Sequence, residues 1–195
     1  MNSCVKYTVY KNLHKYVSVI GYETKDDIKP KEDFNKTMQF HSHIIIRATK
    51  TEEKLYIFLL DEDGFSGKSA EFNKLINIIP EKQADIIMVT HKHVGTSVKK
   101  FLDNYSKKKI TVKNLLYDHF KSDLRNNVMV PKHTLCTQEE VDRVMQECHM
   151  ESLSSFPSIR KDDPQVLWVN GTVGQVIKCE RHMNTGVELY YRVII

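Results

Sequence analysis

Cysteine is scarce in this sequence of 195 residues, and the four that occur are far apart and form no CxxC pair: Cys4, Cys136, Cys148 and Cys179. A disulfide framework or a thiolate zinc site is therefore not expected, and we interpret them as reduced cytosolic or nuclear thiols. No run of about 18 apolar residues is present to cross a bilayer. Residues 1–10 interleave polar and apolar side chains, unlike the apolar core of a signal peptide. No membrane association is expected.

Motifs for catalysis are also sparse. The segment Gly64–Ser69 reads GFSGKS, but only two residues separate its glycines. A P-loop needs four there, so that successive backbone N–H groups can surround a phosphate, and we therefore expect a surface turn. No Ser, Cys or carboxylate lies in a glycine-flanked elbow, and no paired acids stand out. The sequence thus predicts no catalytic residue and no cofactor.

Three looser patterns could in principle hold a metal ion. HxH pairs at 41–43 and 91–93 would point to one face of a strand, but neither has Cys or carboxylates at ligand spacing. Asp33, Glu52 and Lys54 loosely imitate the two acids and lysine of metal-dependent nucleases, although E-x-K is common by chance in a lysine-rich chain. The three Cys and three His of the last third fit no zinc-finger spacing. We expect no metal site.

The first part of the chain begins with a helical pattern. From residue 7 to residue 20 apolar side chains recur at intervals of three and four, which predicts a helix that ends near Gly21. The runs 43–47 and 55–60 are rich in β-branched and apolar residues, and they predict a hairpin.

Strand and helix patterns then alternate. Apolar stripes predict helices over 72–79 and 98–105, on either side of a buried strand at 84–90. Residues 110–117 form a further strand or a short helix. Crossover helices between strands are typical of an α/β domain, which we assign to residues 1–125.

The last third contains local helix signals. Thr137 and Glu140 form a capping box, and Asp163 before Pro164 marks a second helix start. The apolar face of the first helix comprises Val141, Val144, Met145 and Cys148.

After a turn at Gly174, residues 176–181 and 187–195 alternate in polarity around Asn184, which predicts a β-hairpin. We expect a small α+β domain over 126–195, with helices packed on an antiparallel sheet.

Charge is unevenly distributed between the two predicted domains. Residues 126–195 hold 7 Lys and Arg against 9 Asp and Glu, which leaves 22 against 16 for residues 1–125. Over 92–121, eight lysines face only two aspartates: Lys92, Lys99, Lys100, Lys107, Lys108, Lys109, Lys113 and Lys121. This stretch predicts either a phosphate-facing surface or a solvated face that keeps the protein soluble.

Five motifs follow one another in the last third: Val130-Pro131-Lys132-His133, the capped helix from Thr137, Asp163-Pro164, Gly174-Gln175-Val176-Ile177 and Tyr191-Arg192-Val193. In order and in their gaps they resemble the C-terminal domain of RNA polymerase subunit five and its archaeal counterpart. In that family V-P-K-H precedes a Glu-rich helix, and a G-Q-V-V glycine follows the D-P aspartate by eleven residues, the interval from Asp163 to Gly174 here. The matching residues, which the resemblance makes assembly candidates together with Trp168, are Val130, Pro131, Lys132, His133, Asp163, Pro164, Gly174, Gln175, Tyr191 and Arg192.

The first domain resembles the jaw domain of the eukaryotic and viral members, which implies a nuclease-like fold. Gly21-Tyr22 followed by Glu32-Asp33-Phe34 is similar to the family's G-Y and E-D-F, and residues 84–98 resemble its strand and T-P-S loop beside downstream DNA. The resemblance makes Gly95, Thr96, Ser97, Lys99 and Lys100 candidates for DNA contact.

Some positions depart from the family. Ser158 replaces an arginine, with Arg160 and Lys161 nearby, and Thr96 replaces the proline of the jaw loop. Thr172 and Val173 replace basic residues. The pattern D-P-x-V-x-W-x-x-G-x-x-G resembles copies encoded by large DNA viruses, which would act in the host cytoplasm, at the viral factory, or in virions, whereas a cellular copy would act in the nucleus.

The resemblance implies a non-catalytic subunit of a multisubunit DNA-directed RNA polymerase. Its second domain would dock on the largest subunit beside other polymerase subunits, and its basic first domain would lie along downstream duplex DNA with weak, non-specific contacts. It would not be an obligate homo-oligomer. The alternative is an autonomous nuclease-like DNA-binding protein.

Overall fold

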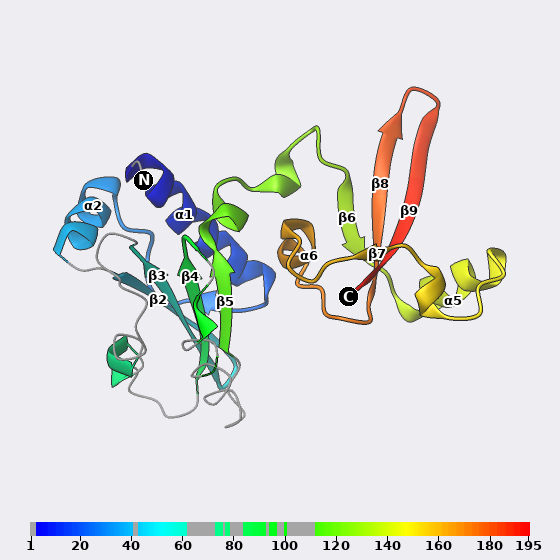
Figure 1. Cartoon of the computed structure of the whole chain (residues 1–195). Coiled ribbons are helices and arrows are strands. Elements are labelled where there is room, and N and C mark those ends of the chain that lie inside the picture. Colours follow the sequence, from blue (N-terminus) through cyan, green and yellow to red (C-terminus); the bar gives the residue numbers. More distant parts are fainter. Residues whose placement is uncertain are drawn as a thin grey trace. The chain divides into compact units, whose positions relative to one another are not determined.

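A computed structural model describes residues 3–40, 43–61, 73–75, 77–78, 84–92, 94–96, 100 and 112–195. The chain divides into two compact units, Met1–Ser122 and Asp123–Ile195. Each unit is described by itself, and Figure 1 labels their helices and strands. The predicted boundary after Arg125 lies just inside the second unit.

The N-terminal unit contains a five-stranded sheet in the order β1-β2-β3-β4-β5. β2 and β3 form the predicted antiparallel hairpin, whereas β3, β4 and β5 run parallel. The parallel pairs agree with the expected α/β class, because parallel neighbours need crossover connections. The strands are β1 (Glu23–Thr24), β2 (His43–Lys50), β3 (Glu53–Leu60), β4 (Asp85–Thr90) and β5 (Val112–Leu116).

The opening helix α1 (Ser3–Val19) forms as predicted and ends where Gly21 adopts a positive φ of 81°. The Tyr22 N–H then donates to the Val17 carbonyl at 3.0 Å, which closes the helix end. A 3-10 helix, η1 (Tyr117–Phe120), follows β5.

The helix α2 (Lys31–Phe40) was not predicted from the sequence. It has little apolar periodicity, and its signals are Pro30 before the first residue and two acids in the first turn. Phe34 anchors it, with its ring centroid 5.1 Å from that of Tyr10 on α1.

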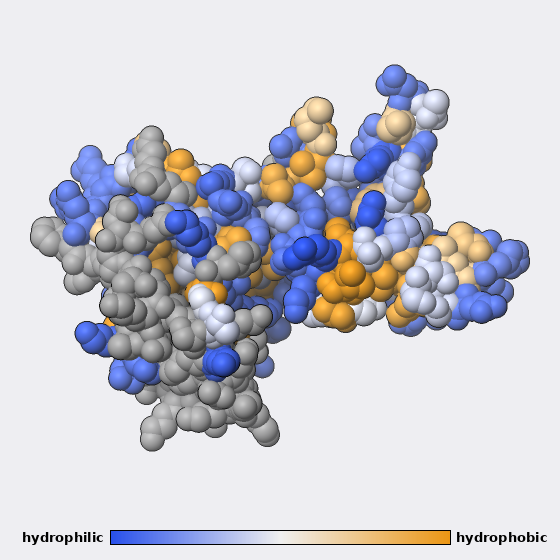
Figure 2. Space-filling model, viewed as in Figure 1, coloured by the Kyte–Doolittle hydropathy of each residue, from blue (hydrophilic) through white to orange (hydrophobic). Residues whose placement is uncertain are grey.

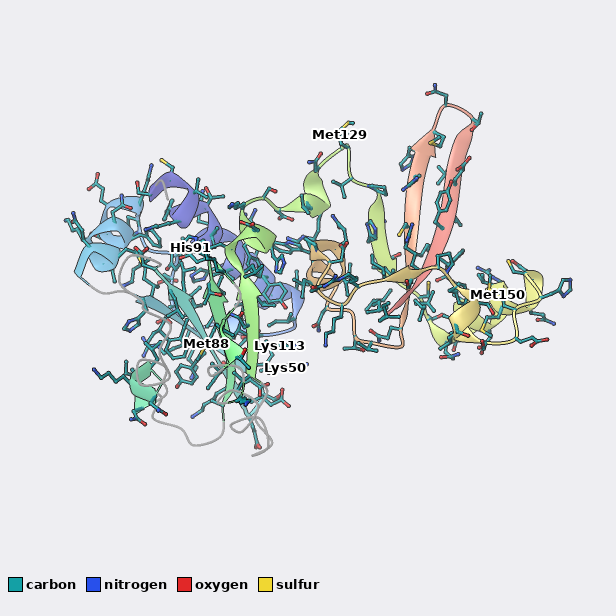
Figure 3. The ribbon with its side chains drawn as sticks, viewed as in Figure 1. Lys50, Met88, His91, Lys113, Met129 and Met150 are labelled. Atoms are coloured by element: carbon teal, nitrogen blue, oxygen red, sulfur yellow. The ribbon has the colours of Figure 1, made fainter. Side chains whose placement is uncertain are left out.

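Both faces of the central strand β3 are buried, as its continuous apolar run predicts. One core cluster unites alternate residues of β3 and β4 with Leu75 and Ala84. Met88 lies in this cluster, within the sheet in Figure 3.

A buried ion pair joins helix α1 to the residue that follows β3. Lys6 Nζ on α1 lies 2.7 Å from both carboxylate oxygens of Asp61, the residue after β3. Their side chains are only 11% and 12% exposed. Because each charge is withdrawn from water, the pair requires both partners.

The C-terminal unit contains a four-stranded sheet in the order β6-β8-β9-β7. The predicted hairpin is β8 (Val176–Met183) and β9 (Gly186–Ile194), joined by a two-residue loop. β6 (Lys132–Leu135) pairs antiparallel with β8. β7 (Ser158–Ile159) pairs parallel with β9, so the sheet is mixed and the expectation of a wholly antiparallel sheet was wrong.

Both predicted helix starts of this unit are confirmed. Thr137 accepts a hydrogen bond from the Glu140 N–H at the start of α5 (Gln138–Glu147). Asp163 accepts from the Gln165 N–H at the start of α6 (Pro164–Trp168). Two 3-10 helices, η2 (Leu124–Asn126) and η3 (Leu153–Ser155), complete the unit.

Two details of α5 differ from the prediction. Cys148 is exposed at the C-cap and does not belong to the buried face, which Val141 and Val144 form. The Glu140 carboxylate, predicted as part of the capping box, accepts a hydrogen bond from Lys178 Nζ on β8 at 2.9 Å and so links the helix to the sheet.

No helix of the described residues is long and apolar enough to span a bilayer. Within the same residues no group of three or more His, Cys, Asp or Glu could hold a metal ion.

Several sequence expectations fall on residues outside the described ranges. They are the GFSGKS turn, the predicted helix over 98–105 apart from Lys100, and the histidines at 41 and 93. Of the predicted helix over 72–79, the described residues 73–75 and 77 are helical.

Candidate functional site

The residues before β6 line a groove in the C-terminal unit. His133 Nδ1 donates to the Pro131 carbonyl at 2.7 Å, and the Val130 N–H donates to the Asn127 carbonyl at 3.0 Å, which together hold this segment in place. Residues 127–132 form one wall of the groove and residues 180–183 of β8 form the other. Three assembly candidates, Val130, Pro131 and Lys132, therefore lie together.

The same segment exposes apolar surface. Val128 is 98% exposed and Met129 is 88% exposed, on the loop before β6 where Figure 3 labels Met129. Exposed apolar side chains beside a groove are typical of a surface that meets another protein. Sequence reasoning missed these two residues, because an apolar pair before a strand reads as core.

A second group of assembly candidates lies at the base of β9. The Gly174 N–H donates to the Ile194 carbonyl, and the Ile194 N–H donates to the Gln175 carbonyl, both at 2.9 Å. Gly174 has a positive φ of 91°, which favours glycine at this turn. Apolar residues are exposed beside the turn, at Val173 and Ile195. Figure 2 shows apolar atoms gathered where β7 and the C-terminal end of β9 meet.

Arg192 contacts Ser158, which stands where the resembled family has an arginine. The Arg192 Nη1 donates to the Ser158 carbonyl at 3.1 Å, so the serine lies directly beside the remaining arginine. Arg160 pairs with Asp162 at 2.7 Å. Arg160, one of the two basic residues near Ser158, therefore has its charge paired with the Asp162 carboxylate.

The side chain of the assembly candidate Trp168 is buried inside the C-terminal unit. It is 1% exposed, and the Arg125 guanidinium lies 4.5 Å from its ring. Arg125 is in turn held by Asp123 at 2.9 Å. Asp163 and Pro164 belong to the start of α6, so this group of candidates shapes the helix.

Tyr191 belongs to a polar contact between α5 and the sheet. Its hydroxyl lies 3.5 Å from Glu140 Oε1, which also accepts from Lys178 Nζ. The hydrogen bond from Lys178 lowers the pKa of Glu140. Burial, followed by the Glu140 charge, raises the pKa of the Cys136 thiol to about 11, so this thiol stays protonated at neutral pH.

In the N-terminal unit the described DNA-contact candidates are exposed. Gly95, Thr96 and Lys100 are open to solvent, whereas Ser97 and Lys99 lie outside the described residues. Lys92, Lys113 and Lys121 of the same stretch are exposed as well.

The three members of the nuclease-like trio lie on different elements: α2, the turn between β2 and β3, and β3 itself. Asp33 lies on α2, 3.9 Å from Lys36, and Glu52 is exposed in the turn between β2 and β3. Lys54 lines a hollow on the sheet with Arg47, whose Nη2 binds Asp26 at 2.8 Å.

Comparison with known proteins adds to this geometry. The family model for "RNA polymerase Rpb5, C-terminal domain" matches residues 122–194, nearly the bounds of the C-terminal unit. The chain is 32% identical over 75 residues to DNA-directed RNA polymerase subunit Rpo5 of Methanosphaera stadtmanae, with 38% of this chain and 96% of that protein covered.

The chain belongs to the Rpb5/Rpo5 family of RNA polymerase subunits. It is also 25% identical over 169 residues to "DNA-directed RNA polymerases I, II, and III subunit rpabc1" of Dictyostelium discoideum, with 85% of this chain and 84% of that protein covered. The Rpb5/Rpo5 resemblance read from the five motifs is thereby confirmed.

Proposed function

We propose that this chain is a non-catalytic subunit of a multisubunit RNA polymerase, with its C-terminal unit docked on the largest subunit. The observation that carries the proposal is the family match over 122–194, whose bounds follow those of a compact unit. The Methanosphaera protein matches over 96% of its own length with 75 residues, which supports a unit of this size as a working whole.

The groove at 127–132 and the apolar residues at the base of β9 support docking by this unit. Val128, Met129, Val173 and Ile195 are all more than half exposed. Burying such side chains stabilises a complex by about 25 cal/mol per Å² of apolar surface, less the cost of association.

The N-terminal unit would form part of the lower jaw along downstream duplex DNA. Residues 1–125 carry 22 Lys and Arg against 16 Asp and Glu, and the described lysines of the 92–121 stretch are exposed. Lysines on a surface neutralise phosphates without reading bases. The subunit would act where that polymerase transcribes: the host cytoplasm or virion for a viral copy, or the nucleus for a cellular one.

Assembly is tested with the two units expressed separately. Residues 123–195 should fold alone and bind the largest subunit, whereas residues 1–122 should not bind it stably. Circular dichroism checks the fold, and co-purification checks binding. A folded C-terminal unit that binds no polymerase subunit would refute the docking proposal.

The jaw proposal is tested by charge reversal within the assembled enzyme. Lys99→Glu with Lys100→Glu should shorten the lifetime of the open complex and lower the slope of its salt dependence by about two. The matched control is Lys29→Glu with Lys36→Glu, which makes the same charge change at exposed positions outside the stretch. Equal lifetimes for both pairs would leave the lysines as a solvated face.

The alternative is an autonomous nuclease-like protein, which the isolated chain can test directly. Cleavage of plasmid DNA that needs a divalent metal and is lost in Glu52→Gln would favour that function over the assembly role.

A further inference from the structure

The hairpin of β8 and β9 extends beyond the strands that flank it, as Figure 1 shows. β6 pairs with β8 only up to Glu180, and β7 pairs with β9 only at Val193 and Ile194. Residues 181–190, which form the outer part of the hairpin, are all exposed. We refer to these ten residues as the arm.

One edge of β9 is open along the arm. Within residues 123–195, no strand pairs with β9 between Gly186 and Arg192 on the side away from β8. The backbone of this edge therefore has donors and acceptors that the sheet does not use.

The residues that face the open edge follow from the hydrogen bonds at the base of β9. The N–H groups of Val193 and Ile195 donate to the β7 side, to Pro157 and Ile159, at 2.9 Å each. Backbone groups alternate sides along a strand that has an antiparallel partner. Val187, Leu189 and Tyr191 therefore present their N–H and C=O groups to the open edge, and the even-numbered residues bond to β8.

This edge has little of the usual protection against pairing, since Glu188 is the one charged residue of 187–191. The segment Val187–Tyr191 reads VELYY, with no proline and no lysine. Val187 is 56% exposed and Leu189 is 50% exposed. Val187 and the two tyrosines are also of the types that favour strands. A two-stranded ribbon without a third strand is marginally stable in water, so the arm gains from a partner.

We propose that the open edge of β9 pairs with an extended strand of another polymerase subunit, which adds a strand to the sheet. This inference rests on the proposed function. An extended chain matches backbone donors and acceptors spaced every second residue. Its occupant would alternate apolar and polar side chains, because Val187 and Leu189 share one face of β9 and Glu188 and Arg192 the other.

The charges on the arm disfavour a nucleic acid as the occupant. Glu188 lies on β9, opposite Arg181 on β8, so the arm has no excess of positive charge at this edge. Carbonyl oxygens alternate with the N–H groups and would repel phosphates. A protein strand satisfies both kinds of group.

The test uses the full chain and the polymerase assembled without this subunit. Leu189→Pro removes an N–H that faces outward, and it leaves the bonds to β8 in place, since proline is tolerated on edge strands with this orientation. The matched control, Leu189→Ala, removes the side chain and keeps the N–H. We expect Leu189→Pro to weaken binding at least tenfold, and Leu189→Ala less than threefold.

A second measurement does not depend on the fold of the proline variant. Amide hydrogen exchange of the wild-type chain should slow at least tenfold at Val187, Leu189 and Tyr191 on assembly, with smaller changes at the even-numbered amides already bonded to β8. Wild-type binding with neither the loss in Leu189→Pro nor this alternating protection would overturn the inference and leave the proposed function intact.

Two other outcomes are also decisive. If the wild-type chain does not bind the polymerase at all, the proposed function and the inference both fail. If the free chain sediments as a dimer that Leu189→Pro dissociates, the occupant is a second copy of this chain, and the inference is overturned.

Discussion

The two units of the chain differ in how far apart along the sequence their stabilising contacts lie. In the N-terminal unit, Lys6 pairs with Asp61, and the Asn12 side chain donates to the Phe120 carbonyl at 2.9 Å across 108 residues. In the C-terminal unit, Thr137 and Asp163 cap their own helices, and a two-residue loop sets the register of the hairpin. The first unit thus depends on contacts between distant segments, and the second has strong local signals.

The largest effect is expected when the buried ion pair of the N-terminal unit is broken. Lys6→Met removes the ammonium group that pairs with the buried Asp61 carboxylate, which should cost about 3–5 kcal/mol of unfolding free energy. The double variant Lys6→Met with Asp61→Leu should recover much of this loss, because both charges are gone. Urea unfolding followed by circular dichroism measures it. A loss below about 1 kcal/mol, the range of surface pairs, would show that the pair is in effect solvated.

The same contrast explains how much the sequence could predict. α1, the β2–β3 hairpin, β4, both helix caps and the β8–β9 hairpin follow from periodicity and capping residues within each segment. The pairing of β7 with β9 could not be predicted, since two residues carry no register signal.

The site was predictable only in part for a similar reason. The five motifs identify the family and its assembly candidates, but not the groove that residues 127–132 form with 180–183. Nor do they show Glu140 bound to Lys178, because that contact joins residues 38 apart. Contacts between side chains that are far apart in the sequence depend on the packing of the whole unit, which local patterns do not encode.

Loss of the buried tryptophan should strongly affect the second unit. Trp168→Ala removes a side chain that is 1% exposed, together with its contact to the Arg125 guanidinium, and should cost about 3–5 kcal/mol. Trp168→Phe keeps an aromatic ring and should lose less. Because this is the sole tryptophan of the chain, unfolding is followed by circular dichroism. Unchanged melting and unchanged assembly together would contradict a structural or docking role for Trp168.

A smaller loss is expected from one added methyl group in the second unit. A Cβ at position 171 would lie 2.6 Å from Ile194 Cδ1 and 3.0 Å from Val166 Cγ1. Gly171→Ala should therefore cost about 1–3 kcal/mol through overpacking. Gly95→Ala is the control in the first unit, since no described residue lies within 4 Å of a Cβ there. If both variants melt alike, the packing around Gly171 is looser than the structure indicates.

The smallest effect is the loss of stability as the pH falls, which should begin at a different pH in each unit. Burial lowers the pKa of His14, against the opposing charge of Asp26, and the ring packs edge-on to Tyr10 at 4.8 Å. A histidine whose pKa is lower in the folded state contributes stability above its ordinary value of about 6.5 and loses it as the pH falls below that value.

Glu140 has the corresponding role in the C-terminal unit, because the hydrogen bond from Lys178 lowers its pKa. A carboxylate of this kind contributes stability above its ordinary value of about 4.3 and loses it as the pH falls through the folded pKa. Between pH 6.5 and the titration of Glu140, the first unit should therefore weaken while the second does not. His14→Gln should flatten the first decline and leave the second, and Glu140→Gln should do the reverse. Melting curves of each variant between pH 3 and 8 measure both declines, and a single shared decline would show that the two units unfold together.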